Sequence, residues 1–179
     1  MRPELREFRD LLVEEKLWGE GGDTDFQINT ALLGSQEARA YHYRCLLLED
    51  NSCRGGLVCR VLRCHSGEVG SVLIFQILVA AVTPKRNGLG RLAVRALQHF
   101  ALQEATRVRC DWVVVCANAL QGVDTFYKRQ AFLSHSLETL TSSFSTLLKR
   151  AKMGHRIGRS VEYFVGTGHG SKMEWCRRV

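Results

Sequence analysis

The chain has 179 residues, a length typical of one compact domain. Its hydrophobic share of 45% argues against a disordered chain, and no stretch approaches the roughly 20 apolar residues of a membrane span. The net charge of +7 comes from residues 71–179, because residues 1–70 hold nine basic against twelve acidic side chains. The first residues lack the apolar core of a secretory signal, so we expect an intracellular protein, cytoplasmic or nuclear, with the nucleus favoured.

Seven cysteines, an odd number, are spread along the chain without a repeating spacing. Cys53, Cys59, Cys64 and His65 come nearest to a zinc site. They contain no Cys-x-x-Cys pair of the kind that structural zinc sites usually show. We therefore expect no metal, and thiols that are reduced and mostly buried.

The first 70 residues predict helices followed by two antiparallel strands. Apolar residues at positions 5, 8, 11 and 12 predict a helix over residues 3–16, and a second helix is expected within residues 25–38. Aliphatic, aromatic and β-branched residues predict strands over 41–48 and 57–64. The turn formers between them, which include Gly55-Gly56, leave too little chain for a helical crossover, so these strands should be antiparallel neighbours.

The remaining residues predict strands that alternate with helices. The predicted elements are a long strand over 72–82, a helix over 89–107, a buried strand over 112–116, a short helix over 125–129, a late helix over 137–152, and a final strand pair over 161–165 and 173–176. We predict an α/β fold, a single domain with a mixed, mostly antiparallel sheet of about six or seven strands and about four or five helices. Residues 1–40 would form N-terminal helices, 41–135 the core, and 136–179 a C-terminal helix and strands.

The junction between the long strand and the helix after it carries the clearest functional pattern, Thr83-Pro84-Lys85-Arg86-Asn87-Gly88-Leu89-Gly90-Arg91. Glycine lacks a Cβ atom, so its backbone can turn tightly and approach a ligand closely. The start of a helix offers unpaired N–H groups and a partial positive charge, to which Lys85, Arg86 and Arg91 add full charges. The sequence therefore predicts a loop that binds a pyrophosphate.

Other interpretations of this loop differ in how well they fit. A nucleoside-triphosphate loop needs Gly-Lys-Ser/Thr, which is absent between Gly88 and Leu92. Gly88-x-Gly90-x-x-Ala93 does fit a dinucleotide fingerprint, but that fold expects an acidic residue near the end of the next strand, whereas Asp111 precedes it. A dinucleotide site and a tight turn without a ligand both stay open.

Two motifs together resemble the GNAT superfamily of N-acetyltransferases. Lys85-x-x-Gly88-x-Gly90 resembles its Arg/Gln-x-x-Gly-x-Gly/Ala motif, with Lys in place of Arg or Gln. Downstream, Asn118 and the run from Thr125 to Phe132 resemble the family's Asn…Phe-Tyr-x-x-x-Gly-Phe segment, with Ala131 where Gly is usual. The resemblance covers roughly residues 41–135.

Within this superfamily the nearest likeness is to the transcriptional-coactivator histone acetyltransferases. Residues 76–82 are similar to their catalytic strand, and Lys128-Arg129-Gln130 is similar to a basic-basic-Gln run. Gln76 stands where those enzymes usually carry Glu. The resemblance implies a lysine of a protein as the acceptor, with histones among the candidates.

The resemblance also implies how the reaction would proceed. The sheet would splay at an acetyl-CoA cleft, and the amine would attack the thioester directly while Tyr127 protonates the departing thiolate; Tyr127 could instead be a packing residue. Gln76 cannot take a proton, and Glu68, His65, Asp111 and Asp124 are the candidates for a general base. The residues expected to contact acetyl-CoA are Leu78, Val79, Ala80, Val82, Lys85, Arg86, Asn87, Gly88, Leu89, Gly90, Arg91, Asn118, Phe126 and Tyr127.

Two other functions stay open, a catalytically weak acyl-CoA-binding scaffold and an acetyltransferase that acts on small amines or protein N-termini. The basic second half is either a solvated face or a surface for a phosphate-rich partner. It would repel a basic histone tail unless the tail lies near Glu49-Asp50. The basic residues concerned are Lys149, Arg150, Lys152, Arg156, Arg159, Lys172, Arg177 and Arg178.

Overall fold

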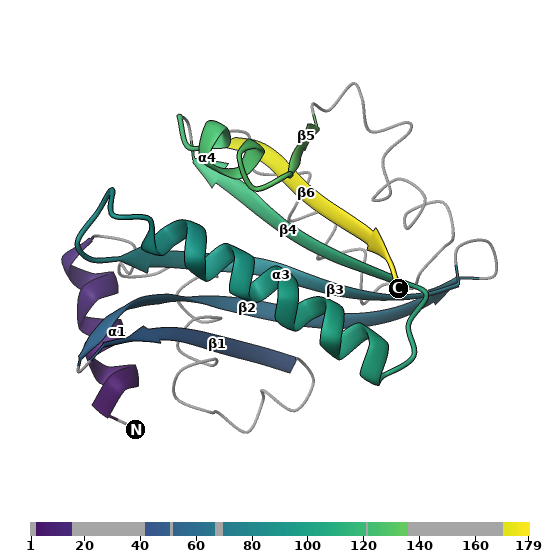
Figure 1. Cartoon of the computed structure of the whole chain (residues 1–179), viewed down its shortest axis with the longest axis horizontal. Helices are drawn as coiled ribbons and strands as arrows, with labels where there is room; N and C mark the ends of the chain where they lie inside the picture. Colours follow the sequence, from purple (N-terminus) through teal and green to yellow (C-terminus); the bar gives the residue numbers. More distant parts are fainter. Residues whose placement is uncertain (1–2, 16–41, 51, 67–69, 121, 136–169) are drawn as a thin grey trace. The chain divides into compact units, whose positions relative to one another are not determined.

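The structure is a computed structural model that describes residues 3–15, 42–50, 52–66, 70–120, 122–135 and 170–179. Its elements are α1 (Pro3–Glu14), β1 (His42–Glu49), β2 (Cys53–Ser66), β3 (Gly70–Val82), α3 (Leu89–Arg107), β4 (Trp112–Leu120), α4 (Asp124–Lys128), β5 (Leu133–His135) and β6 (Gly170–Arg178) (Figure 1). The strands form a six-stranded sheet in the order β1-β2-β3-β4-β6-β5. The predicted α/β fold class is confirmed.

The chain divides into two compact units. Unit 1 consists of Met1–Val61 and Ile77–Leu97, and unit 2 consists of Leu62–Gln76 and Gln98–Val179. The elements β2, β3 and α3 each contribute residues to both. The predicted single domain with boundaries near residues 40 and 135 stays a prediction.

The core of unit 1 lies between α1 and the strands. The predicted spacing places Phe8, Leu11 and Leu12 on one side of α1, where they pack against Val58 of β2 and Val79 of β3. Each fully buried side chain of this size contributes about 1.5–3 kcal/mol. From the middle of α1, the Glu7 carboxylate accepts a hydrogen bond of 2.8 Å from the backbone N–H of Cys53. These contacts fix the last residues of β3 beneath α1.

The expected antiparallel pairing of β1 with β2 is confirmed, but the predicted turn at Gly55-Gly56 is wrong. Both glycines lie inside β2. These two positions require glycine because the neighbouring backbones leave no room for a side chain. A Cβ atom would lie 2.3 Å from the carbonyl oxygen of Ala81 at Gly55, and 2.3 Å from that of Leu46 at Gly56. Gly55 also has a φ of +127°, which L-residues rarely adopt. The glycines therefore allow β2 to approach both neighbouring strands.

In unit 2, β6 pairs antiparallel with β4 on one side and β5 on the other. Figure 1 shows β6 beside β4, with α4 at one end of the pair. The strand predicted at 112–116 continues to Leu120, the one at 173–176 spans Gly170–Arg178, and β5 was not predicted. The predicted elements at 25–38, 137–152 and 161–165 lie outside the described residues.

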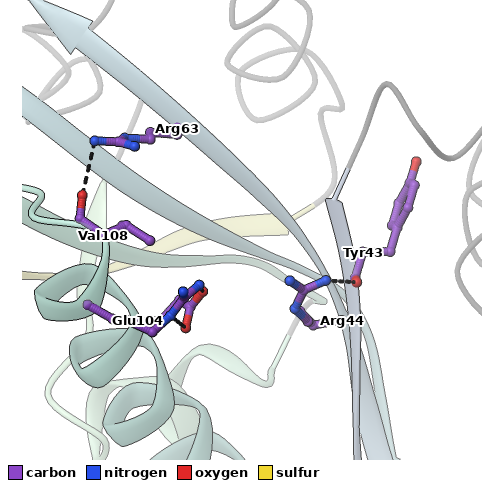
Figure 2. A network of polar contacts seen from close by, with 6 residues as sticks. Tyr43, Arg44, Arg63, Glu104 and Val108 are labelled. Carbon is purple, nitrogen blue, oxygen red and sulfur yellow. Dashed lines mark hydrogen bonds and ion pairs between the residues drawn. The ribbon is translucent and has the colours of Figure 1, made fainter.

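The long helix α3 has the predicted bounds. Its end is closed by Arg109 in a left-handed conformation with a φ of 54°, after which the N–H of Cys110 bonds the carbonyl of Ala105 at 2.9 Å. Arg63 of β2 donates a hydrogen bond of 3.0 Å to the carbonyl oxygen of Val108 (Figure 2). A guanidinium at this point also suits the partial negative charge of a helix end.

No described helix is long and apolar enough to cross a membrane.

Candidate functional site

The end of β3 presents two different faces. Alternation along the strand places Leu78, Ala80 and Val82 on one face, where Ala80 is exposed and the other two are half-buried. Val79 and Ala81 point the other way and are only 8% exposed in the core beneath α1. Of the residues predicted to contact acetyl-CoA, Val79 could therefore do so only through its backbone.

The loop after β3 is exposed, and a hydrogen bond to β2 holds its first residue in place. The N–H of Thr83 donates a hydrogen bond of 2.8 Å to the carbonyl of Arg54, which holds the loop to β2. Arg86 and Gly88 have positive φ angles of 65° and 87°, whereas Asn87 between them does not. Such alternation is typical of the backbone nests that bind anions. A Cβ atom on Gly88 would meet nothing closer than Arg91 Nη2 at 3.8 Å, so this glycine is needed for its conformation and leaves space above it.

The first turn of α3 leaves hydrogen-bond donors unused. The carbonyl of Gly88 accepts the N–H of Leu92 at 3.0 Å, and the side chain of Asn87 accepts the N–H of Leu89 at 3.2 Å. Among the described residues no acceptor is bonded to the N–H groups of Gly90 and Arg91. The first turn contains no acidic residue. An anion is the natural partner for this helix end.

The three predicted cations of the loop are in different situations. Lys85 forms an ion pair with Glu15, its Nζ atom lying 2.5 Å from Oε2. Arg91 reaches back over Gly88. Neither Arg86 nor Arg91 forms an ion pair with a described residue. The guanidinium groups of Arg86 and Arg91 could therefore contact a ligand. The ion pair between Lys85 and Glu15 was not predicted from the sequence.

Tyr127 of α4 is buried in an aromatic cluster. The residue is 7% exposed, and the centroid of its ring lies 5.1 Å from that of Phe126 and 5.3 Å from that of Phe132. Burial raises the pKa of Tyr127 to about 12, so the phenol stays protonated at neutral pH. No described residue hydrogen-bonds to the hydroxyl group. Tyr127 is therefore a packing residue that also carries a proton-donating group.

The residues after Tyr127 form a helix-ending motif. The N–H of Phe132 bonds the carbonyl of Tyr127 at 3.2 Å, and the N–H of Ala131 bonds that of Lys128 at 3.1 Å. This is the Schellman pattern, whose left-handed residue is usually Gly. Ala131 occupies that position with a φ of 63°. The glycine expected there by resemblance thus has a conformational reason, and the packing of Phe132 on Tyr127 completes the motif.

Two further predicted residues lie on strands of unit 2. Gln76 is buried in β3, where the residue is 7% exposed, and its neutral amide cannot accept a proton. Asn118 lies on β4, where it pairs with Lys172 of β6. Gln76, Asn118, Phe126 and Tyr127 belong to unit 2, and the predicted residues from Leu78 to Arg91 belong to unit 1. Their roles toward acetyl-CoA stay predictions.

Two of the four candidate bases are weakened by their partners. Ser71 donates hydrogen bonds to the Asp111 carboxylate from its N–H at 2.7 Å and its hydroxyl at 2.8 Å, which lowers the pKa of Asp111. Lys128 donates one to Asp124 at 2.7 Å and likewise lowers the pKa of Asp124. A carboxylate with a lowered pKa is a poorer base.

Of the other candidates, His65 is exposed near the end of β2, and Glu68 lies outside the described residues. Sequence reasoning missed Glu174, a buried carboxylate of β6 with 7% exposure. The signal that could have found it is an acidic residue inside an apolar predicted strand.

The cysteines whose side chains the structure describes are thiols, either buried or partly buried. Burial raises the pKa of Cys45, Cys59 and Cys176 to about 12, so each stays protonated, whereas metal binding requires a thiolate. Within the described ranges, no group of three or more His, Cys, Asp and Glu side chains could hold a metal ion. The basic run from Lys149 to Arg159 lies outside those ranges.

Comparison with solved structures identifies the architecture. A candidate acetyltransferase of the GNAT family from Desulfovibrio desulfuricans aligns over 99% of this chain and 94% of its own, with a TM-score of 0.53 and 12% identity. NAA60 from Arabidopsis thaliana, in complex with a bisubstrate analogue, aligns over 99% and 94%, with a TM-score of 0.52 and 10% identity. Naa50 from Arabidopsis thaliana, in complex with the bisubstrate analogue CoA-Ac-MVNAL, aligns over 100% and 95%, with a TM-score of 0.50 and 10% identity.

Sequence comparison adds nothing to this result. No family model matches the chain, and a search of curated proteins finds no match. The likeness in structure is a likeness of fold, and the chain has the fold of GNAT-family acetyltransferases.

Proposed function

We propose that the chain is an acetyl-CoA-dependent N-acetyltransferase. The observation that carries the proposal is the exposed loop at the start of α3. It combines the N–H groups of Gly90 and Arg91, the left-handed Gly88 and two guanidinium groups. In the described part of the chain, these N–H groups have no acceptor and neither guanidinium group has an ion-pair partner. These features suit the diphosphate of CoA. A GNAT fold around such a loop supports acetyl transfer more than dinucleotide binding.

In the proposed reaction, the acceptor amine attacks the thioester carbonyl, so that a C–N bond forms, the C–S bond breaks with its electron pair on sulfur, and the nitrogen gives a proton to water. Backbone N–H groups of residues 78–80 on β3 would stabilise the developing oxyanion. Tyr127 would act on the leaving thiolate. Because its pKa is about 12 and a thiol has a pKa of ~8.5, the phenol would stabilise the thiolate by a hydrogen bond and keep most of its proton.

The acceptor we propose is an amine of a protein or peptide, as the peptide-bearing analogue bound by Naa50 supports. A lysine, including lysines of histones, follows from the sequence resemblance and would suit a nuclear protein. A lysine amine has a pKa of ~10.4, so neutralising it at pH 7 costs roughly 4–5 kcal/mol, and Gln76 offers no base for the task.

A protein N-terminus is the second candidate. Its α-amine has a pKa of about 7.7–8.0 and needs little help to lose its proton. The bisubstrate analogue bound by Naa50, CoA-Ac-MVNAL, carries its acetyl group ahead of a peptide, and together with the absence of a carboxylate at position 76 it favours this acceptor.

A panel of peptides tests the proposal. Peptides with a free or an acetylated N-terminus, each with and without lysine, and a polyamine are incubated with acetyl-CoA, and mass spectrometry locates any acetyl group. Transfer to either kind of peptide amine supports the proposal, and the position of the acetyl group decides between lysine and N-terminus. Acetylation of the polyamine alone would identify a small-amine enzyme. Binding of CoA without any transfer would indicate a scaffold.

We further propose that the basic second half offers a surface to a phosphate-rich partner. In the described part of that half, the Arg177 guanidinium lies 5.6 Å from the centroid of the Trp175 ring. Loss of binding to a polyanion after the run from Lys149 to Arg159 is neutralised would support this surface.

A further inference from the structure

An ion pair links the end of α1 to the first cation of the phosphate loop. Glu15 follows the last residue of α1, and its N–H still bonds the carbonyl of Leu11 at 2.9 Å, so the helix fixes its position. Its carboxylate lies 2.5 Å from Nζ of Lys85. The Glu15 side chain is 25% exposed and that of Lys85 is 67% exposed, and both residues belong to unit 1.

The stability of α1 does not explain a carboxylate at this position. The carbonyl end of a helix carries a partial negative charge, which disfavours Asp and Glu and favours Lys and Arg. An exposed ion pair of this kind contributes little to stability. The adjacent Glu14 is also acidic and exposed, but it forms no ion pair within the described ranges. The feature that distinguishes Glu15 is its contact with the loop.

A bound diphosphate and the Glu15 carboxylate would both attract the ammonium group of Lys85. Lys85 stands at the first position of the glycine motif, three residues before Gly88. While it is paired with Glu15, its charge is largely compensated, and the carboxylate adds a negative charge beside the anion site. Arg86 and Arg91 have no such competitor among the described residues.

We propose that Glu15 is an affinity-determining residue, which competes with the phosphates of acetyl-CoA and CoA for Lys85. Binding would transfer the Lys85 ammonium from the carboxylate to a phosphate oxygen, and the pair would form again on release. The inference rests on the proposed function. It assigns Glu15 the effect of weakening the complex and so of speeding the departure of CoA after the reaction.

Isothermal titration of CoA at low ionic strength tests the competition. Glu15→Gln keeps the shape of the side chain and removes the charge, so it should raise CoA affinity about two- to five-fold. Glu14→Gln is the matched control, since it changes the net charge equally at the next residue without touching Lys85, and it should leave the affinity nearly unchanged. In a Lys85→Gln background, the gain from Glu15→Gln should shrink, and salt at about 0.3 M should reduce it as well.

The outcomes separate this inference from the proposed function. Equal effects of Glu15→Gln and Glu14→Gln, with CoA bound by both, would overturn the competition and leave the CoA site intact. Weaker binding by Glu15→Gln would also overturn it, because Glu15 would then hold Lys85 in place for the ligand. If neither the unmodified chain nor any of the variants binds CoA, the proposed function is wrong, and the inference is wrong with it.

Discussion

The two segments that resemble GNAT motifs are built in opposite ways. The loop from Thr83 to Gly88 is exposed, rich in cations and ends at a helix start whose N–H groups at Gly90 and Arg91 bond to no described residue. The segment from Asp124 to Phe132 buries Tyr127 and Phe132, and its left-handed residue closes α4. The N–H groups of Gly90 and Arg91 and the guanidinium groups of Arg86 and Arg91 have no partner among the described residues. By contrast, packing and helix capping account for most residues of the α4 segment.

This difference shows how much each motif says about function. Donors and charges that no described residue uses are open to a ligand in place of water, so the features of the loop suit anion binding. The α4 motif mainly supports the fold, and its chemical role depends on one hydroxyl group. Variants of the loop should therefore change binding and spare stability, and variants that alter the packing or the helix end of the α4 segment should do the reverse.

The largest effect is expected on stability at Phe132. Phe132→Ala removes a ring that is 2% exposed and should lower the free energy of unfolding by about 3–5 kcal/mol, measured by urea denaturation. Arg86→Ala, in the exposed loop, should change it by less than about 0.5 kcal/mol. Comparable losses at both positions would remove the contrast between the two segments.

The next largest effect concerns binding by the loop. Gly90→Glu places a carboxylate and a side chain where the diphosphate would approach, and should weaken CoA binding about a hundred-fold or more in isothermal titration. Circular dichroism should show an unchanged fold. Gln103→Glu adds the same charge to an exposed position of α3 and serves as the control. Unchanged CoA affinity in a folded Gly90→Glu protein would show that the loop is not the site.

Tyr127→Phe should lower turnover by about ten- to a hundred-fold, since a hydrogen bond to a charged group contributes about 1.5–3 kcal/mol. CoA affinity and stability should hardly change. Because burial holds the pKa of Tyr127 near 12, the turnover that depends on Tyr127 should not fall as pH passes 10, where an ordinary tyrosine ionises. Unchanged turnover, with the chemical step limiting the rate, would leave Tyr127 a packing residue alone.

The smallest effect is expected at the end of α4. Ala131→Gly relieves a left-handed alanine with a φ of 63° and should raise the free energy of unfolding by about 0.5–1 kcal/mol. The same exchange at the partly buried Ala96 inside α3 should lower it by about 1 kcal/mol. Thermal melts compare the two. A loss at both positions would show that the conformation at residue 131 is not strained.

Local patterns predicted the elements and the loop. Periodic apolar residues gave α1, and the glycines with the following helical pattern gave the start of α3 at Leu89. What the sequence did not predict depends on contacts between distant residues. Gly55 looks like a turn former until the backbone of Ala81 lies against it, and the Glu15–Lys85 pair joins α1 to the loop after β3.

The candidate site also has one part that local patterns predict and another that depends on contacts between distant residues. The anion-binding character of the loop follows from a few adjacent residues, so it could be predicted. Whether a carboxylate can act as a base depends on its partners in space. Asp111 was a reasonable candidate until Ser71, 40 positions earlier, was found to donate two hydrogen bonds to it. Glu174 is buried on β6, which lies between β4 and β5 in the sheet.

The most direct test of the central claim is the exchange of the backbone amides of Gly90 and Arg91, measured by NMR with and without CoA. If these N–H groups hold the diphosphate, CoA should slow their exchange markedly, and pantetheine, which lacks phosphates, should not. CoA that binds without protecting either amide, or protection by pantetheine to the same degree, would contradict the account.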